Sequence, residues 1–256
     1  MTERQPSSSP SLQRFLRARV ARDHHLGLPL TTGLMAALAT VLLFGLIAYE
    51  VSSKGALTRL DQQLADWFNQ HAFSPLTELV LGYTHLHGTI GVLVMGALLL
   101  WHMVRKQRWA WVTDLVLVLP GGMLCNFSLK QLFARLRPSF DDPILVLHSY
   151  SFPSGHTIGA TLLYAMLAAY LLNQPGVTAA IGTRLKTGER GVQAAVIGAA
   201  LLLVALTAFS RVYLGAHFLS DVLGAMLLGT AWFALWTTVV FTWQRHYYAP
   251  PRSNGL

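Results

Sequence analysis

Long apolar runs alternate with short polar segments along almost the whole chain. Six of these runs are long enough to cross a bilayer as helices, which takes about 20 mainly apolar residues. We predict spans near residues 29–50, 78–103, 110–131, 154–172, 191–210 and 217–243. Asp114 interrupts the third run near one end, and a strong turn signal, Asn173-Gln174-Pro175-Gly176, ends the fourth. The pattern predicts an all-α integral membrane protein with six transmembrane helices.

The segment between the first two spans has a different pattern. Apolar residues recur there at helical spacing, opposite polar ones: Leu57, Leu60, Leu64, Trp67 and Phe68 against Arg59, Asp61, Gln62 and Asp66. Such a pattern predicts an amphipathic helix lying on the outer membrane surface. An ordinary packed connector between two spans explains it equally well. Neither interpretation assigns chemistry to this segment.

The ends of the chain differ from the apolar middle. Residues 1–25 are rich in Ser, Pro and Arg, and we expect them to form a disordered basic tail in the cytoplasm. The run from Leu26 to Tyr49 is long enough to span, and no small-residue cleavage pattern follows it, so we expect an uncleaved span. Residues 26–245 are then one six-helix domain, and residues 246–256 a second cytoplasmic tail.

Basic residues are unevenly divided between the two sides of this topology. One side holds thirteen of the nineteen: Arg4, Arg14, Arg17, Arg19, Arg22, Arg105, Lys106, Arg108, Arg184, Lys186, Arg190, Arg245 and Arg252. The other side holds Lys54, Arg59, Lys130, Arg135, Arg137 and Arg211. Because Lys and Arg accumulate on the cytoplasmic side, we expect a multi-pass inner-membrane protein with both termini in the cytoplasm.

Composition excludes several other classes of protein. The chain is 53% hydrophobic and 12% charged, with a mean hydropathy of +0.45, whereas a soluble domain has about 25% charged residues. The net charge of +8 is explained by loops that face an anionic leaflet, so we expect no nucleic-acid partner. Cys125 is the one cysteine, which excludes an intramolecular disulfide and a cysteine-based metal site.

Three polar clusters lie at ends of apolar runs that this topology brings to the outer face. They are Lys130 with Arg137-Pro138, then Pro153-Ser154-Gly155-His156, then the stretch from Ser210 to Asp221, which contains Arg211 and His217. Ionisable groups at such positions cost free energy and are usually kept for function.

Each cluster alone has a purely structural explanation. Lys130 and Arg137 repel each other unless an anion lies between them, but they also fit snorkelling anchors. Ser154 and Gly155 suit a helix start that binds phosphate through free N–H groups, or simply a well-capped helix. His217 and Asp221 at i and i+4 of a helix fit an oriented imidazole, or a salt-bridged helix entry. Their joint occurrence on one side favours a site for a phosphoryl group.

Metal binding is not expected. His85 and His87 are separated by one residue, which points them to different sides of a helix, so an interfacial or headgroup-contact role is the better interpretation. No other His, Asp and Glu cluster offers a metal cage, and we expect activity without added metal and no cofactor.

At these three clusters the sequence resembles the signature of type 2 phosphatidic acid phosphatases (PAP2). Lys130-x6-Arg137-Pro138, Pro153-Ser154-Gly155-His156 and Ser210-Arg211-x5-His217-x3-Asp221 match its three parts in order and spacing. The superfamily also includes vanadium haloperoxidases and glucose-6-phosphatase. Size and topology resemble its bacterial branch of phosphatidylglycerophosphatase B and undecaprenyl-diphosphate phosphatases.

The resemblance implies a two-step, metal-independent hydrolase of phosphoric ester or diphosphate bonds. His217 would attack phosphorus, Asp221 would orient it, and His156 would protonate the leaving group and then activate water. The phosphoryl oxygens would be held by Lys130, Arg137, Ser154, Gly155 and Arg211. The choice of His217 over His156 as nucleophile comes from the resemblance.

The expected function is that of a lipid phosphate phosphatase at the periplasmic face. Undecaprenyl diphosphate, phosphatidylglycerophosphate and phosphatidate are the expected substrates, and membrane lipids the expected surroundings; the sequence implies no protein partner. A lipid A phosphatase or a lipid phosphotransferase is a close alternative. An anion or lipid transporter belongs to a different class, in which ionisable groups gather at the midplane rather than at one face.

Overall fold

The computed structural model describes residues 27–248, and the regular structure of this part of the chain is helical. The helices are α2 (Leu28–Ser52), α3 (Ala56–His71), α4 (Leu76–Leu86), α5 (Thr89–Arg105), α6 (Trp109–Phe133), α7 (Gly155–Leu172), α8 (Pro175–Leu185), α9 (Glu189–Tyr213) and α10 (Leu219–Tyr248). The predicted tail at 1–25 lies outside the described residues, as do residues 249–256 of the second tail.

Five of the described helices are long and apolar enough to cross a membrane: α2, α6, α7, α9 and α10. The second predicted span is different, because α4 and α5 meet at an angle of 49°. The break falls at His87 and Gly88, where the backbone of Gly88 is extended (φ −65°, ψ 169°) and precedes α5. The pair makes a sixth crossing only if the two helices act as one broken span.

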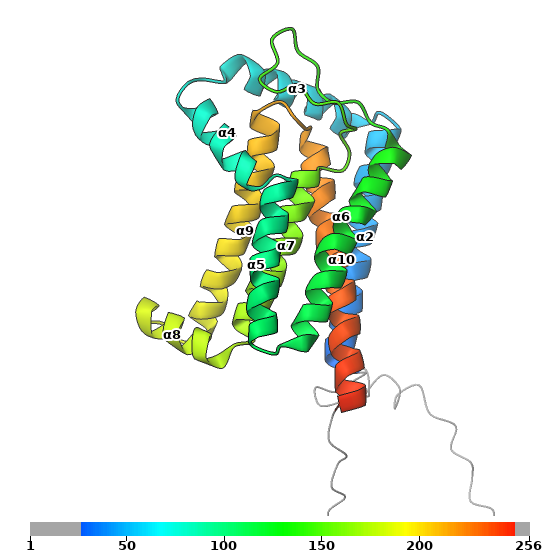
Figure 1. Cartoon of the computed structure of the whole chain (residues 1–256). Coiled ribbons are helices and arrows are strands. Elements are labelled where there is room, and N and C mark those ends of the chain that lie inside the picture. Colours follow the sequence, from blue (N-terminus) through cyan, green and yellow to red (C-terminus); the bar gives the residue numbers. More distant parts are fainter. Residues whose placement is uncertain (1–26, 249–256) are drawn as a thin grey trace, which may run out of the picture.

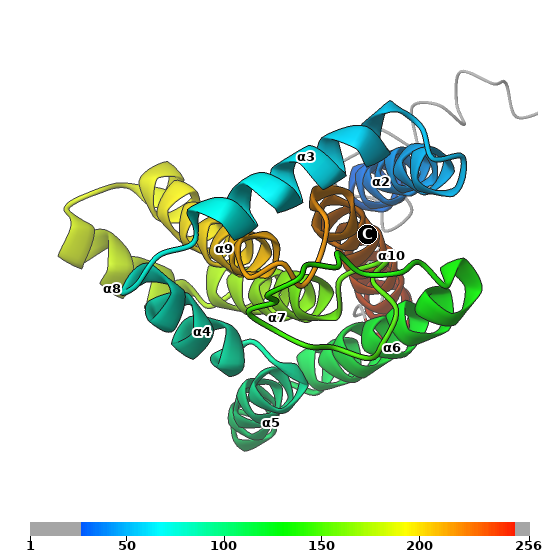
Figure 2. The ribbon, with the colours of Figure 1, turned by 90° about the horizontal axis from the view of Figure 1, so that it is seen from above.

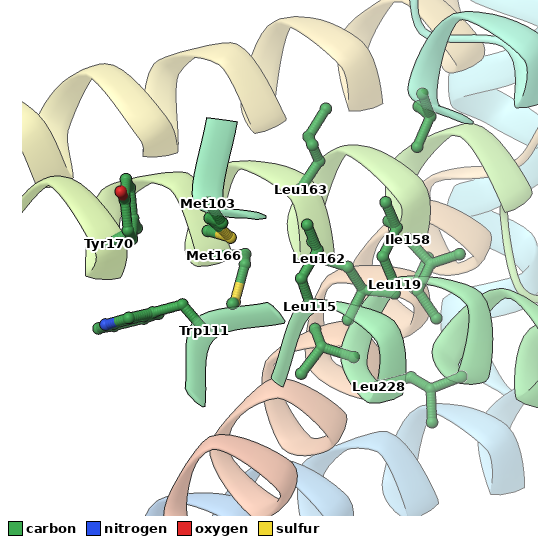
Figure 3. Close-up of a cluster of buried hydrophobic side chains, with 13 residues drawn as sticks. Met103, Trp111, Leu115, Leu119, Ile158, Leu162, Leu163, Met166, Tyr170 and Leu228 are labelled. Carbon is green, nitrogen blue, oxygen red and sulfur yellow. The ribbon is translucent and has the colours of Figure 1, made fainter. Parts of the chain in front are cut away.

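The long helices form a bundle around α7 (Figure 2). This helix packs against α5, α6, α9 and α10, and α2 packs on the outer side of α10. Apolar side chains of α5, α6, α7 and α10 fill the space between these helices, with Met103, Leu162 and Met166 fully buried at its centre (Figure 3). Asp114 is buried too, and accepts a hydrogen bond from Thr237 of α10 at 2.9 Å. The bundle is therefore a rigid frame for the segments at its two ends.

The two ends of the bundle carry different segments (Figure 1). The helix α3 lies across one end, together with the loop after α6 and the turn between α9 and α10. The opposite end holds α8, the start of α2 and the end of α10. Sequence analysis predicted only a turn at 173–176; the chain does turn at Asn173 and Gln174, but Pro175 then opens α8. Proline is well suited to the first position of a helix, because its missing N–H needs no partner there.

The helix α3 forms where the amphipathic pattern predicted it, but one of its polar residues faces inwards. Asp61 is fully buried against the bundle, next to Ala65, whereas Leu60 and Trp67 are 47% and 52% exposed. The simple division into a polar face towards water and an apolar face towards the membrane is therefore wrong at Asp61. Its carboxylate has partners on other elements, described below.

Candidate active site

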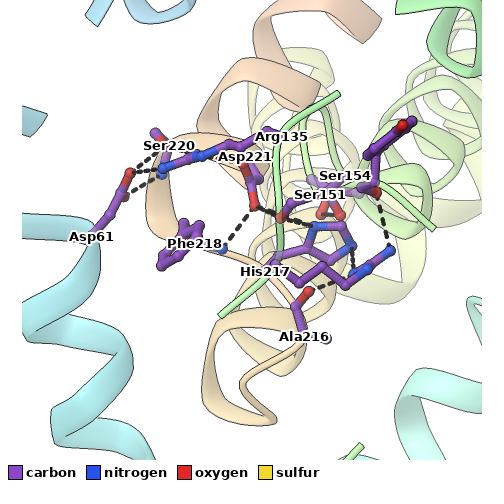
Figure 4. A network of polar contacts seen from close by, with 12 residues as sticks. Asp61, Arg135, Ser151, Ser154, Ala216, His217, Phe218, Ser220 and Asp221 are labelled. Atoms are coloured by element: carbon purple, nitrogen blue, oxygen red, sulfur yellow. Dashed lines mark hydrogen bonds and ion pairs between the residues drawn. The ribbon is translucent and has the colours of Figure 1, made fainter. Parts of the chain in front are cut away.

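All three predicted clusters lie at the end of the bundle that α3 covers, and Figure 4 shows the contacts that join them. The first comes from the end of α6 and the loop after it, the second from the start of α7, and the third from the turn between α9 and α10. The segments that carry these side chains are far apart in sequence, and the bundle brings them together.

His217 lies in the turn before α10 rather than in the first turn of that helix, which begins at Leu219. The expectation that His217 and Asp221 share a helical face is therefore wrong in detail. The turn is fixed by Gly215, whose backbone has φ of +64° and where a Cβ atom would lie 2.7 Å from the ring of Phe140. After it, the N–H of His217 donates to the carbonyl of Arg211 at 3.1 Å.

Asp221 holds the His217 ring from one side. Its Oδ2 lies 3.4 Å from His217 Nδ1 and accepts hydrogen bonds from the Phe218 N–H at 2.8 Å and from the Ser151 hydroxyl. A separation of 3.4 Å is longer than a strong hydrogen bond, but the contact still favours the tautomer with its proton on Nδ1. In that tautomer the lone pair of Nε2 points to the other side of the ring.

Arg137 lies on that other side. Its Nη1 is 3.1 Å from His217 Nε2 and donates to the carbonyl of Ala216 at 2.5 Å. Its Nε donates to the carbonyl of Ser149 at 2.6 Å. Lys130 is buried near the end of α6, and its Nζ donates to the carbonyls of Tyr150 and Ser151 at 2.7 and 3.0 Å. Both cations are thus held by neutral oxygens.

Arg211 is also held by a neutral oxygen. It is 2% exposed, and its Nη1 donates to the Thr84 hydroxyl of α4 at 2.7 Å. Its Nε is buried without a hydrogen-bond partner in the described part of the chain. A buried, unpaired guanidinium N–H costs about 1–3 kcal/mol, which an anionic ligand would recover.

The second cluster forms the start of α7. Ser154 occupies the N-cap position as predicted, but its side chain makes no capping hydrogen bond; its Oγ instead accepts one from Thr157 at 3.1 Å. The hydroxyl proton of Ser154 thus remains available to another acceptor. A Cβ atom on Gly155 would lie 3.6 Å from Asn126 and 3.9 Å from Lys130, so the glycine keeps this backbone open to the site.

His156 follows at the rim of the site. It is half-buried, and within residues 27–248 its ring has no hydrogen-bond partner. A Cβ atom added to Gly88 would lie 3.6 Å from its Nε2, so the break between α4 and α5 forms one wall beside the ring.

The structure places the two histidines near the end of α4 in different environments. His87 is buried, with Nε2 2.7 Å from the Tyr164 hydroxyl and Nδ1 3.1 Å from the Tyr83 carbonyl, so it does not lie at an interface. His85 is exposed. The described residues hold no group of three or more His, Cys, Asp or Glu side chains that would fit a metal ion.

The charges of the site are unbalanced. Among the described residues the ion pairs are Arg135 with Asp61 and Arg135 with Asp221. His217 also contacts Asp221, and this contact becomes an ion pair only when the ring is protonated. Lys130, Arg137 and Arg211 consequently have no carboxylate within 4.0 Å in this part of the chain, which is the environment an anion requires. Burial, and then neighbouring cations with Arg137 first, hold the pKa of His217 well below its usual range. Its imidazole is therefore neutral near pH 7.

Sequence reasoning missed four side chains that support these residues: Asp61, Thr84, Arg135 and Ser151. Arg135 lies inside the first motif, but its spacing gave no sign that it would bind Asp221 rather than a ligand. Thr84 and Asp61 are ordinary residues of apolar or amphipathic segments. Ser151 lies just before the second motif, and that position was the one available signal.

Comparisons with known proteins identify the family of this chain. The model of the PAP2 superfamily matches residues 111–245, a range that contains all eight predicted site residues. Phosphatidylglycerophosphatase B of Bacillus subtilis (strain 168) is 32% identical over 164 residues, which are 62% of this chain and 73% of that protein. Lipid phosphate phosphatase delta of Arabidopsis thaliana is 34% identical over 90 residues, 35% of this chain but 19% of that protein.

A solved structure of another membrane protein has a similar fold. The crystal structure of a transmembrane PAP2 type phosphatidylglycerolphosphate phosphatase from Bacillus subtilis superimposes with a TM-score of 0.64 and 27% sequence identity. The match covers 78% of this chain and 93% of that chain. The likeness therefore extends over most of the fold.

Proposed function

The chain belongs to the PAP2 superfamily and is a multi-pass membrane phosphatase, and we propose that it hydrolyses lipid phosphates at the periplasmic face through a phosphohistidine. The substrates we propose are phosphate monoesters or diphosphates of lipids, such as phosphatidylglycerophosphate, phosphatidate and undecaprenyl diphosphate. The observation that carries this proposal is a buried, neutral His217 beside three cations that have no carboxylate partner.

In the first step, the lone pair of His217 Nε2 forms a bond to phosphorus while the bond from phosphorus to the lipid oxygen breaks. His156 gives a proton to that leaving oxygen. Asp221 stabilises the positive charge that develops on the ring, through the contact at Nδ1. The phosphoryl group would enter between Nε2 and Arg137, which now lie 3.1 Å apart.

In the second step, His156 takes a proton from water, and the water oxygen attacks phosphorus as the nitrogen–phosphorus bond breaks. Inorganic phosphate leaves and His217 is neutral again. Lys130, Arg137 and Arg211 hold the phosphoryl oxygens in both steps, together with the Ser154 hydroxyl and the Gly155 N–H. Their fixed positions stabilise the charge that spreads over these oxygens in the transition state.

The proposed orientation rests on the distribution of charge at the two ends of the bundle. Lys106 and Arg108 lie between α5 and α6, and Arg184 and Lys186 at the end of α8, all at the end opposite the site. Positive charge of this kind marks the cytoplasmic side. The site then faces the periplasm, and α3 lies at the outer membrane surface. With α4 and α5 as one broken span, the chain is a six-span inner-membrane protein.

The test is phosphate release by the purified protein in detergent, measured with malachite green on a panel of lipid monophosphates and diphosphates. We expect release by the wild type, none by His217→Ala, and a severe reduction in His156→Ala. His102→Ala is the matched control, because His102 lies at the opposite end of the bundle, on α5. Full activity of His217→Ala would exclude the phosphohistidine, and transfer of phosphate to a lipid acceptor would identify a phosphotransferase.

A further inference from the structure

A line of three charged side chains, two of them fully buried, connects α3 to the proposed nucleophile (Figure 4). Arg135 Nη2 donates to Asp61 Oδ2 at 2.8 Å, and Arg135 Nη1 donates to Asp221 Oδ1 at 2.6 Å. The side chains of both carboxylates are 0% exposed, and that of Arg135 is 11% exposed. The line continues from Asp221 to His217.

We propose that Asp61 and Arg135 are positioning residues for the reaction: Asp61 fixes Arg135, and Arg135 fixes the carboxylate that orients His217. This inference rests on the proposed function of His217. Neither residue touches the reacting atoms in this scheme. Asp61 and α3 lie outside the range of the chain that matches the PAP2 superfamily model.

The geometry leaves Arg135 little freedom. Its two terminal nitrogens reach two different carboxylates, and its guanidinium lies over the Phe218 ring, 4.3 Å from the centroid. Asp61 is itself fixed by Ser220, which lies in the first turn of α10. Its Oδ1 accepts a hydrogen bond from the Ser220 N–H at 2.9 Å, and its Oδ2 accepts one from the Ser220 hydroxyl at 2.5 Å. A carboxylate on α3 therefore satisfies an N–H at the start of α10, where a negative charge is also favoured by the helix dipole.

Fixing one oxygen of Asp221 determines where the other one points. With Oδ1 held by Arg135, Oδ2 faces His217 Nδ1, the Phe218 N–H and the Ser151 hydroxyl. Loss of Arg135 would free the carboxylate to rotate, and His217 would lose its preference for one tautomer.

Charge balance gives Asp61 a second effect. Asp221 with Arg135 alone would be neutral, whereas the three groups together carry one negative charge. That negative charge is what stabilises the His217 ring as it becomes positive during attack. Asp61→Asn should therefore weaken His217 as a nucleophile even if every hydrogen bond were kept.

The test compares Asp61→Asn, Arg135→Gln and Arg135→Lys with Asp66→Asn. Asp66 is the matched control because it lies on the same helix and contacts Gln62, away from the line of charges. We expect kcat to fall by about 10- to 100-fold in Asp61→Asn and Arg135→Gln, by analogy with the groups that orient metal-binding histidines. Inhibition by inorganic phosphate should change by less than about threefold, because the three anion-binding cations remain. Arg135→Lys should retain part of the activity.

The double variant tests whether the two residues act as a unit. The loss in Asp61→Asn with Arg135→Gln should be smaller than the product of the two single losses, because either change already breaks the line of contacts. Additive losses, a wild-type kcat in Asp61→Asn, or equal losses in kcat and phosphate affinity would overturn the proposal.

A measurement without turnover separates this inference from the proposed function. NMR of isotope-labelled histidine in detergent reports the tautomer of His217, with His217→Ala as the assignment control. We expect a proton on Nδ1 in the wild type and in Asp66→Asn, and a mixture of tautomers in Arg135→Gln. A wild-type tautomer in Arg135→Gln would refute positioning. Absence of phosphate release by the wild type would refute the proposed function, while the tautomer still decides the role of Arg135.

Discussion

Replacing Asp221 with asparagine should reduce activity strongly, although the two side chains are almost equal in size. Both oxygens of Asp221 accept hydrogen bonds: Oδ1 from Arg135 at 2.6 Å, and Oδ2 from the Phe218 N–H at 2.8 Å. The amide of an asparagine has one oxygen and one NH₂ group. Whichever way the amide turns, its NH₂ group faces a donor.

The substitution has one effect on folding and a second on the rate. A buried donor without an acceptor costs about 1–3 kcal/mol, chiefly in folding free energy. In the transition state, the positive His217 ring loses a full negative charge at 3.4 Å. At an effective dielectric constant of 20, this interaction amounts to about 5 kcal/mol. Since about 1.4 kcal/mol corresponds to a tenfold change in rate and part of the loss relaxes, we expect kcat to fall by about 10²- to 10⁴-fold.

Rapid-quench measurement of phosphoenzyme formation from radiolabelled phosphatidate in detergent is the suitable assay, because it isolates the first step. Asp142→Asn is the control, since Asp142 is exposed in the loop after α6. Inhibition by inorganic phosphate should persist in Asp221→Asn and shows that the protein is folded. Phosphoenzyme formation within about threefold of the wild-type rate, in a folded variant, would refute the assigned role of Asp221.

Two further predictions concern the neighbours of Asp221. Because the pKa of His217 is held well below its usual range, its ring should stay neutral as the pH falls through about 6.5, where an exposed histidine takes up a proton. NMR of isotope-labelled histidine measures this, and titration of the His217 ring near pH 6.5 would contradict the prediction. Thr84→Val removes the acceptor of Arg211 and should cost about 1–3 kcal/mol of unfolding free energy in detergent. The cost should shrink in saturating phosphate, and an equal cost in both conditions would contradict an anion site at Arg211.

The long helices could be predicted from the sequence because hydropathy depends mainly on local composition. The bounds of α2, α6, α7 and α9 lie close to those expected. The break at His87 and Gly88 could not be predicted in the same way. Apolar residues continue on both sides of it, and the His87 ring bonds Tyr164, which is 77 residues away in the chain.

The candidate site also has a part that could be predicted from the sequence and a part that could not. The three motifs could be recognised from local spacing, and the segments that carry them lie at one end of the bundle (Figure 1). Asp61 was placed on a polar face, and periodicity cannot distinguish a face towards water from one towards a buried polar group. Its partner Ser220 is 159 residues away, so only the packing of α3 across the bundle reveals the contact.

Arg135 and Arg137 show most clearly what the packing adds. They are two residues apart, and both follow the end of α6, where Ala134 takes a left-handed conformation (φ 43°). Arg135 lies between two carboxylates, whereas Arg137 donates to carbonyl groups and to His217. If Asp61 were absent, the charge of Arg135 would cancel that of Asp221, and the cations around His217 would have no negative charge behind the ring. The negative charge behind the His217 ring therefore depends on α3, a helix outside the range that carries the motifs.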